Sequence, residues 1–333
     1  MTKQIYTNNT NIPLSLAVWL ADDAYDYINK PNYISVTTLI KSPRQIVLSS
    51  RSPKRDELID ISNLMATTIG ESIHTSIESS WVNKYKQSML RLGYTPEIVA
   101  RIRINPTPED LLSDNTIIPV YMEQRVLRQW DKWTIGGKYD FVGNGTLEDF
   151  KSTNVFSYTS GTNEWKYKLQ GSLYRWLNPD IITSDYMYIQ FIFKDWKKYE
   201  AKYKAEKGYP ATPLLQHKIK LMSLPETELW VKQKMELLNN LWEVPETELP
   251  LCESQDLWQD ASTYKYYKNP EKTVRSTGNF DTMAEATIKW IEDGRCGVIK
   301  EVPGQAKGCL YCDAFNLCTQ KDTLIANGTL KLQ

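Results

Sequence analysis

The sequence of 333 residues predicts an α/β sandwich with a mixed central β-sheet, extended at its C-terminal end by a helical and cysteine-rich region. Three observations predict this class. An amphipathic helical pattern comes first, three β-prone runs follow it, and a second helix then leads into a fourth β-prone run. This order gives helical layers on a three-stranded antiparallel segment, and the last strand makes the sheet mixed.

The first helix is expected around residues 69–81. Its apolar residues recur every four positions, as in a helix that buries one side, at Ile69, Ile73, Ile77 and Trp81. His74 and Glu78 are also four residues apart and stand directly beside this stripe. They therefore lie at the edge of the buried face, where a metal ligand would have to sit. A hydrogen-bonded core histidine is the alternative interpretation of His74.

The β-prone runs cover residues 117–130, 132–142 and 147–151, and the turn Gly143-Asn144-Gly145 joins the last two. An Asn-Gly pair between β-prone runs is a strong hairpin signal. Residues two apart in a strand share a face, so Asp149 and Lys151 point the same way, and pairing brings Asp140 alongside them. Two carboxylates beside a lysine suit Mg²⁺ or Mn²⁺, and the lysine can then position a water for attack on a phosphodiester. A surface salt bridge on a hairpin is the alternative.

The second helix is expected at residues 164–177, before the stop signal Asn178-Pro179. Gln170 and Tyr174 are four residues apart on it and share a face. The fourth β-prone run is residues 185–196. Residues 213–242 are interpreted as helical, and the proline-bearing residues 244–254 as a linker.

Five cysteines are present, and none precedes residue 252. Cys309, Cys312 and Cys318 form a compact C-x₂-C-x₅-C set, which points to metal more than to disulfides in a cytosolic chain. Three thiolates need a fourth donor, and Cys252 and Cys296 are the candidates. Buried cysteines without a metal are the alternative.

The motifs resemble, in kind and in order, those of the RecB-like branch of the PD-(D/E)XK nuclease superfamily. They are His74 on a helix, Gly137-x-x-Asp140, Asp149-x-Lys151 and Gln170-x-x-x-Tyr174, and the resemblance covers roughly residues 34–195. It departs from the pattern at Tyr139, which stands in place of the proline of the superfamily's name.

The resemblance implies a restriction-endonuclease-like core and a metal-dependent DNA nuclease, an exonuclease in phage DNA recombination, repair or degradation. His74, Asp140, Asp149 and the backbone carbonyl of Phe150 would bind Mg²⁺ or Mn²⁺. Lys151 would act on the attacking water, and Gln170 and Tyr174 would hold the substrate backbone. Glu123 matches a glutamate that many members keep beside the metal, and it is equally interpreted as a solvated strand residue.

The cysteine tail resembles the C-terminal staple of several RecB-like nucleases, in which a 4Fe–4S cluster joins one upstream cysteine to a C-x₂-C-x₅-C set. The resemblance favours Cys252 as the fourth ligand and leaves Cys296 as a spare thiol. In those families the lone cysteine precedes the nuclease core, whereas Cys252 follows it. Tetrahedral Zn²⁺ therefore stays a rival, and either group would be structural.

The composition bounds partners and location. Lys and Arg (40) equal Asp and Glu (40), which argues against a broad DNA-coating protein but not against an enzyme with one basic groove. Without a signal-peptide core or a membrane-spanning apolar run, the chain is expected in the cytoplasm, the host's if a phage encodes it, with no membrane partner. DNA is the expected partner, with recombination or helicase proteins beside it.

Three regions are expected: an N-terminal segment packing on the core (1–66), the nuclease core (67–200) and the extension (201–333). A catalytically inactive DNA-binding or assembly protein of the same fold, and an RNA-directed nuclease, are the alternative functions. Degenerate copies of the superfamily usually lose the carboxylates or the lysine. Their presence in this chain favours activity.

Overall fold

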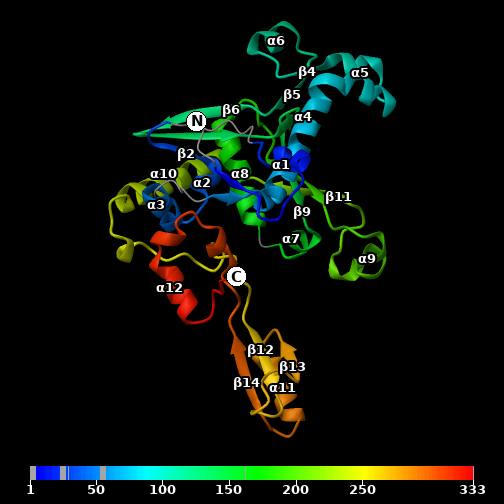
Figure 1. Ribbon diagram of the computed structural model, residues 1–333. Helices are drawn as coiled ribbons and strands as arrows, with labels where there is room; N and C mark the ends of the chain where they lie inside the picture. The colour runs from blue at the N-terminus through cyan, green and yellow to red at the C-terminus, as the bar shows by residue number, and fades with distance from the viewer. Residues whose placement is uncertain (1–4, 23–27, 29, 53–57, 162, 333) are drawn as a thin grey trace. The chain divides into compact units, whose positions relative to one another are not determined.

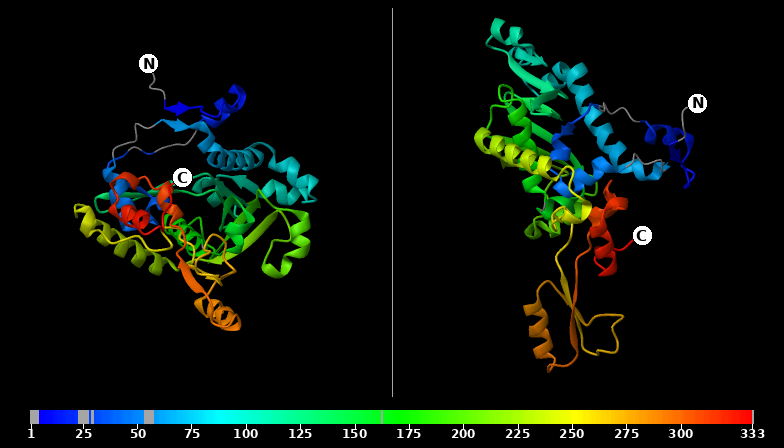
Figure 2. Two further views of the ribbon diagram at one scale, coloured as in Figure 1. Left: turned by 60° about the horizontal axis from the view of Figure 1, so that its bottom comes forward. Right: turned by 90° about the vertical axis from the view of Figure 1, so that its left-hand side faces the viewer.

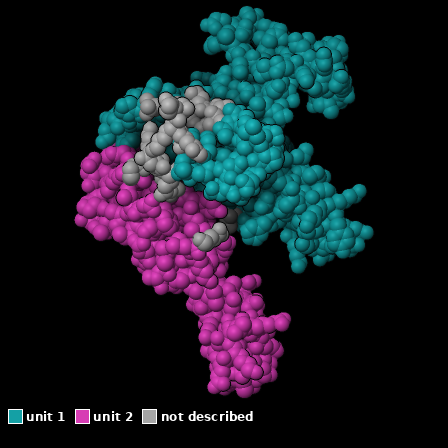
Figure 3. Space-filling view, in the orientation of Figure 1, with its two compact units in different colours: residues 1–40, 55–234 teal, residues 41–54, 235–333 magenta. Residues whose placement is uncertain are grey.

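The computed structural model describes residues 5–22, 28, 30–52, 58–161 and 163–332. The chain divides into two compact units, residues 1–40 with 55–234 and residues 41–54 with 235–333 (Figure 3). The predicted N-terminal segment contributes to both units, and parts of it lie outside the described residues. Among the described residues, every helix is too short or too polar to cross a membrane.

The first unit is built on a six-stranded mixed sheet in the order β11-β10-β9-β8-β5-β4 (Figure 1). β9 pairs with β10, and β4 with β5, in parallel, whereas the other neighbours are antiparallel. The strands are β4 (Ile102–Ile104), β5 (Ile118–Met122), β8 (Phe141–Gly143), β9 (Thr146–Thr153), β10 (Tyr186–Phe193) and β11 (Leu214–Lys220). The predicted mixed sheet is confirmed.

Helices pack on this sheet from two sides. On α4 (Met65–Arg91), Trp81 contacts a cluster that contains Phe141 and is joined by Phe150 of β9. On α8 (Glu164–Leu177), Gly171 lies against Met187 of β10. Paired residues of neighbouring strands lie on the same face of a sheet. Leu147 of β9 pairs with Met187, so Leu147, Asp149 and Lys151 are on the face toward α8. Phe150 is on the opposite face, toward α4. The predicted α/β sandwich is therefore confirmed.

The predicted strands 117–130 and 132–142 are each divided between two sheets. The second half of the first run is β6 (Arg125–Trp130), and the first half of the second run is β7 (Trp133–Lys138). These two strands form a three-stranded sheet with β2 (Tyr33–Ser35). The expectation of continuous strands was wrong because Glu123, between β5 and β6, has a positive φ of 52°. The left-handed conformation turns the hairpin out of the main sheet. The turn between β8 and β9 agrees with its prediction, with positive φ at both Asn144 and Gly145.

The region 213–242 was predicted wholly helical, and this is wrong in its first third. β11 pairs antiparallel with β10 as an edge strand, and α10 (Leu224–Leu241) begins only after Ser223, whose side chain accepts from the Glu226 N–H. The other elements of the first unit are β1 (Tyr6–Thr7), α1 (Leu14–Leu20), α2 (Val36–Leu39), β3 (Ile59–Asp60), η1 (Ile61–Leu64), α5 (Pro96–Arg101), α6 (Pro108–Ser113), α7 (Val155–Thr159), α9 (Lys198–Tyr203) and η2 (Ala205–Lys207).

The second unit is less helical than the sequence predicts. β12 (Thr263–Tyr267) pairs antiparallel with β13 (Gly278–Phe280) and β14 (Val298–Val302), and α11 (Met283–Glu292) packs against this small sheet (Figure 2). The remaining elements are α3 (Pro43–Arg51), η3 (Glu246–Glu248), η4 (Lys307–Tyr311), η5 (Phe315–Leu317) and α12 (Thr319–Ala326). The last three surround the C-terminal cysteines.

Candidate active site

The break between the two sheets places two carboxylates side by side. The Glu123 N–H donates to the Asp140 carbonyl over 3.1 Å, so the hairpin pairing continues through the break and sets these residues opposite each other. A non-glycine residue with positive φ costs on the order of 1–3 kcal/mol and persists where the surroundings hold it. The Glu123 carboxylate contacts Lys138 Nζ at 2.5 Å. Its backbone conformation is thus fixed at the point where its side chain meets Asp140.

His74 reaches this point from α4. Its Nε2 lies 3.1 Å from the Phe150 carbonyl oxygen, and its Nδ1 lies 3.5 Å from Asp140 Oδ1. A carbonyl only accepts, so Nε2 carries a proton; in the protonated ring Nδ1 also donates to Asp140, whereas in the neutral ring the Nδ1 lone pair can bind a metal. Histidine ligands of metals commonly donate their other N–H to a backbone carbonyl in this way. The hydrogen bond with Asp140 raises the pKa of His74, although burial opposes the effect.

Ligand atoms of His74, Glu123 and Asp140 all lie within 4.8 Å of one another, a spacing that one metal ion can bridge. Burial raises the pKa of Asp140, but the His74 hydrogen bond and the charges of His74 and Lys151 outweigh it, so the net shift is downward. Burial raises the pKa of Glu123, and the neighbouring Lys138 only partly opposes this. Two carboxylates and an imidazole are a donor set that suits Mn²⁺ or Mg²⁺.

Buried Asp149 and half-buried Lys151 form an ion pair next to this group. Lys151 Nζ lies 2.5 Å from Asp149 Oδ2, and Asp149 is 2% exposed. Burial raises the pKa of Asp149 to about 6, although Lys151 opposes the shift. Burial also lowers the pKa of Lys151, but the charges of Asp149 and Asp140 outweigh it and hold that pKa above its usual value. Lys151 is therefore a protonated donor at neutral pH.

Asp140 connects the two groups. Its Oδ2 accepts from the Phe150 N–H over 2.9 Å, while its Oδ1 faces His74. One carboxylate thus holds the backbone between Asp149 and Lys151 and faces the metal-binding group with its other oxygen.

A cleft of about 490 Å³ opens over the three-ligand group and is also lined by Glu78 and Tyr174. Gln170 Nε2 donates to the Tyr174 hydroxyl over 3.0 Å, so the two predicted residues of α8 are hydrogen-bonded to each other.

The packing around Gly137 explains why the Gly-x-x-Asp motif has a glycine at this position. A Cβ there would lie 2.8 Å from the Tyr174 ring and 3.0 Å from Val36, so strand β7 needs a glycine to pack against that ring.

We expect Gly137→Ala to lower the free energy of unfolding by about 1–3 kcal/mol, because the methyl group overpacks the contact with Tyr174. Urea denaturation measures the change. Gly70→Ala is the control for a methyl group with room around it, since a Cβ at Gly70 has its nearest neighbour, Ser152 Oγ, at 3.6 Å; because Gly70 lies within α4, this change should be stabilising. Equal stability of the two variants would contradict the close packing of Gly137.

The structure places the predicted residues in two adjoining sets. His74 and Asp140 lie together with Glu123, and Asp149 is held by Lys151, outside the three-ligand group. The Phe150 carbonyl accepts from His74. Sequence reasoning missed Tyr167, whose ring centroid lies 5.9 Å from Lys151 Nζ. Its position one turn before Gln170 on the same helix is the signal that could have found it.

The predicted tail cysteines lie in the second unit, where Cys252, Cys309, Cys312 and Cys318 line one small cavity of about 20 Å³. Cys296 is exposed and is not among the lining residues. Burial raises the pKa of Cys252 to about 12 and that of Cys309 to about 11. Without a cation these two thiols are therefore neutral, and the four cysteines that line the cavity are of the type that binds a metal as thiolates.

The backbone of Cys252 is clamped to α12. Gln320 accepts from the Cys252 N–H and donates to the Cys252 carbonyl, each over 2.9 Å. Because Gln320 follows Cys318 by two residues, this clamp fixes the linker cysteine beside the C-terminal set.

No protein-family model and no curated protein matches the chain. Two solved structures are similar to it at low identity. One is entitled the crystal structure of SSO0001, with 14% identity and a TM-score of 0.36 over 63% of this chain and 79% of that one. The other is a candidate exonuclease from Eubacterium rectale, with 13% identity and a TM-score of 0.34 over 63% of this chain and 81% of that one. Similarity at this level identifies no family, and function is inferred from the geometry of the site.

Proposed function

We propose that this protein is a divalent-metal-dependent DNA nuclease that hydrolyses phosphodiester bonds. The observation that carries the proposal is the convergence of His74, Glu123 and Asp140 within 4.8 Å, in the lining of one cleft and next to the Lys151–Asp149 pair. Two carboxylates and an imidazole can hold a metal ion for phosphodiester hydrolysis, and a protonated lysine can stabilise the charge that develops on the phosphate.

The three-ligand group is the proposed site for Mg²⁺ or Mn²⁺, with Asp149 and the Phe150 carbonyl as neighbouring ligands. When bound, the ion supplies Lewis acidity to the phosphate and lowers the pKa of a water. His74 Nδ1 and the carboxylates hold their positions through contacts to Phe150 and Lys138. Lys151 stays protonated, so it orients the attacking water and stabilises the negative charge that develops on the phosphate. Gln170 and Tyr174 present amide and hydroxyl groups to the substrate backbone.

For the tail we propose a structural 4Fe–4S cluster, with Zn²⁺ as the rival, held by Cys252, Cys309, Cys312 and Cys318. Four half-buried cysteines that line one small cavity support this ligand set. When bound, the group supplies cross-linking of separate chain segments and therefore stability.

We expect Asp140→Asn and Glu123→Gln to weaken Mn²⁺ binding by about 10- to 100-fold, because each neutralises an anionic ligand of the close group. His74→Ala should be milder, or should change the preference between Mn²⁺ and Mg²⁺, since imidazole suits the softer ion. Titration calorimetry without DNA measures these affinities.

The Mn²⁺ affinity of Asp149→Asn is the informative comparison, because the Asp149 carboxylate is already paired with Lys151. A smaller loss than in Glu123→Gln would identify the three-ligand group as the primary site. Unchanged Mn²⁺ affinity in both Asp140→Asn and Glu123→Gln would contradict the assigned ligands.

The form of the nuclease is tested by digestion of linear duplex, closed circular and single-stranded DNA, and of RNA, each with and without Mn²⁺. We propose an exonuclease in phage DNA recombination, repair or degradation, so linear DNA should be degraded from its ends and circular DNA should survive. Cleavage of circles would indicate an endonuclease, and RNA cleavage alone an RNA-directed enzyme. DNA binding without cleavage would indicate the inactive DNA-binding alternative.

A further inference from the structure

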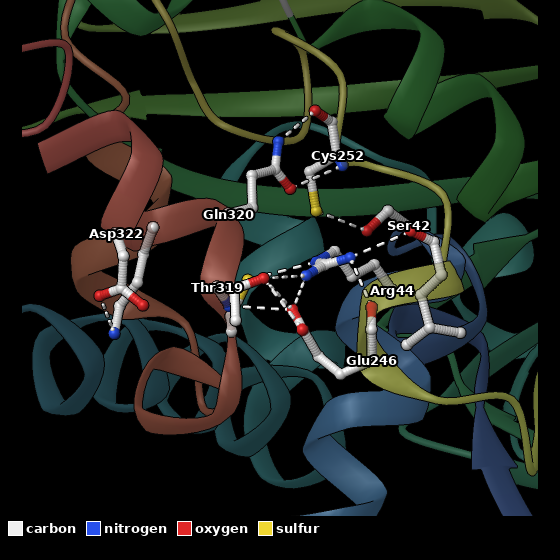
Figure 4. Close-up of polar contacts among 10 residues, drawn as sticks. Ser42, Arg44, Glu246, Cys252, Thr319, Gln320 and Asp322 are labelled. Carbon is white, nitrogen blue, oxygen red and sulfur yellow. Dashed lines mark hydrogen bonds and ion pairs between the residues drawn. The ribbon is translucent and has the colours of Figure 1, made fainter. Parts of the chain in front are cut away.

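A buried arginine contacts the cysteine cavity from a distant part of the sequence. Arg44, on the first turn of α3 (Figure 4), is 2% exposed, and its Nε donates to Cys318 Sγ over 3.2 Å. A guanidinium is costly to bury unless its charge and its N–H groups are matched. The partners of Arg44 therefore show what fixes it there.

The two terminal nitrogens of Arg44 bind protein oxygens. Nη1 donates to the carbonyls of Glu246 and Leu249 over 3.2 and 3.0 Å, and Nη2 forms an ion pair with the Glu246 carboxylate. The same carboxylate accepts from the Thr319 N–H over 2.9 Å, at the start of α12 (Figure 4). These contacts hold the guanidinium in one orientation, with the Nε–H directed at the Cys318 sulfur.

A second polar contact to the cavity comes from the N-terminal end of α3. The Ser42 hydroxyl oxygen accepts from the Gln45 N–H over 3.2 Å as the helix N-cap, and it lies 3.1 Å from Cys252 Sγ. Because its oxygen already accepts from the helix, its proton is available to a Cys252 thiolate. Ser42 and Arg44, at the start of α3, thus contact two different cysteines of the cavity.

We propose that Arg44 and Ser42 are positioning residues that hydrogen-bond the metal-bound thiolates of Cys318 and Cys252 and hold the metal group in the tail. The inference rests on the proposed metal group. A cation and a hydroxyl that donate to anionic sulfur stabilise the thiolate form and slow loss of the metal. If the group is an iron–sulfur cluster, hydrogen bonds to sulfur also raise its reduction potential.

The test compares metal release from the full-length chain, purified anaerobically, under excess chelator. Arg44→Met alone leaves the Glu246 carboxylate unpaired, so the informative variant is Arg44→Met/Glu246→Gln, compared with Glu246→Gln alone. Glutamine keeps an acceptor for Thr319, and only the double variant loses the N–H···S bond. We expect the double variant to release its metal about 10- to 100-fold faster than Glu246→Gln. If iron is present, its midpoint potential should also shift to lower values.

Two controls separate this role from general loss of structure. Arg51→Gln removes an arginine of the same helix that donates to the carbonyls of Leu241 and Trp242, and it should release metal as the wild type does. Thr282→Ala removes the N-cap of α11, as Ser42→Ala removes that of α3, but only Ser42→Ala should speed release.

Equal release from Glu246→Gln and the double variant, both loaded with metal, would overturn the role of Arg44 and leave the metal tail standing. Wild-type protein that contains neither iron nor zinc would overturn the metal tail and this inference together.

Discussion

Lys151→Ala is expected to lower the rate of DNA cleavage by at least about 10²- to 10³-fold while leaving the fold and DNA binding largely intact. The loss is comparable to removing one preorganised donor that stabilises charge in a transition state. Lys151 is proposed to act on the water and the developing charge, and therefore contributes little to binding in the ground state. Single-turnover cleavage and a separate binding titration measure the two effects.

The Lys151→Ala variant is informative only if it still folds, and its folding depends on Asp149. It is buried and loses its ion-pair partner in Lys151→Ala. Burial already raises the pKa of Asp149 to about 6, so the carboxyl can become neutral in place of remaining an unpaired charge. Circular dichroism should show an intact fold. Lys289→Ala, which removes a lysine of α11 that pairs with Asp293, is the control and should cleave normally. Cleavage by Lys151→Ala near the wild-type rate would remove the catalytic role of this lysine.

Loss of any one of the four tail cysteines should lower metal content and melting temperature together. Ligands that close around a metal couple its binding free energy to folding, so replacing one ligand loosens the segment that it holds. We expect Cys252→Ser, Cys309→Ser, Cys312→Ser and Cys318→Ser each to lower the melting temperature by roughly 10 °C, which corresponds to a few kcal/mol for a domain of this size. Differential scanning calorimetry and elemental analysis of the same samples measure both effects.

Cys296→Ser is the matched control, because this cysteine is exposed and lies outside the cavity. It should change neither metal content nor melting temperature. About four iron with matching sulfide per chain would identify the cluster, and one zinc the rival. Metal-free protein with an unchanged melting temperature in Cys309→Ser would show that the tail cysteines are packing residues. Loss of metal in Cys296→Ser but not in Cys252→Ser would show that the fourth ligand is wrongly chosen.

The sequence predicts what local patterns control. The helix predicted from a four-residue apolar repeat and the Asn-Gly turn before β9 depend on near neighbours, and both are found, although the residues of the repeat are half-buried in α4 and not fully buried. β11 was missed because an edge strand with a weak alternation, flanked by leucines, is not distinguished from a helix by periodicity. The sheet of β12 to β14 was missed although Thr263–Tyr267 is rich in β-prone residues.

The candidate site was predicted less completely for a physical reason. The grouping of Glu123 with His74 and Asp140 depends on a left-handed backbone conformation between β5 and β6, and no periodic pattern encodes it. Asp149 and Lys151 share a face, as a strand requires, but their mutual ion pair is a tertiary outcome of burial. Arg44 contacts Cys318 across 274 residues of sequence, a separation that motif spacing does not bridge.

Metal-dependent nuclease activity is tested most directly by cleavage of end-labelled linear DNA. The full-length protein is assayed with Mn²⁺ and again after EDTA, and the Glu123→Gln variant is assayed with Mn²⁺. We expect rapid release of labelled nucleotides with Mn²⁺, none after EDTA, and a rate lowered at least about tenfold in Glu123→Gln. Cleavage that persists in EDTA, or an unchanged rate in Glu123→Gln, would contradict a nuclease whose metal is held by His74, Glu123 and Asp140.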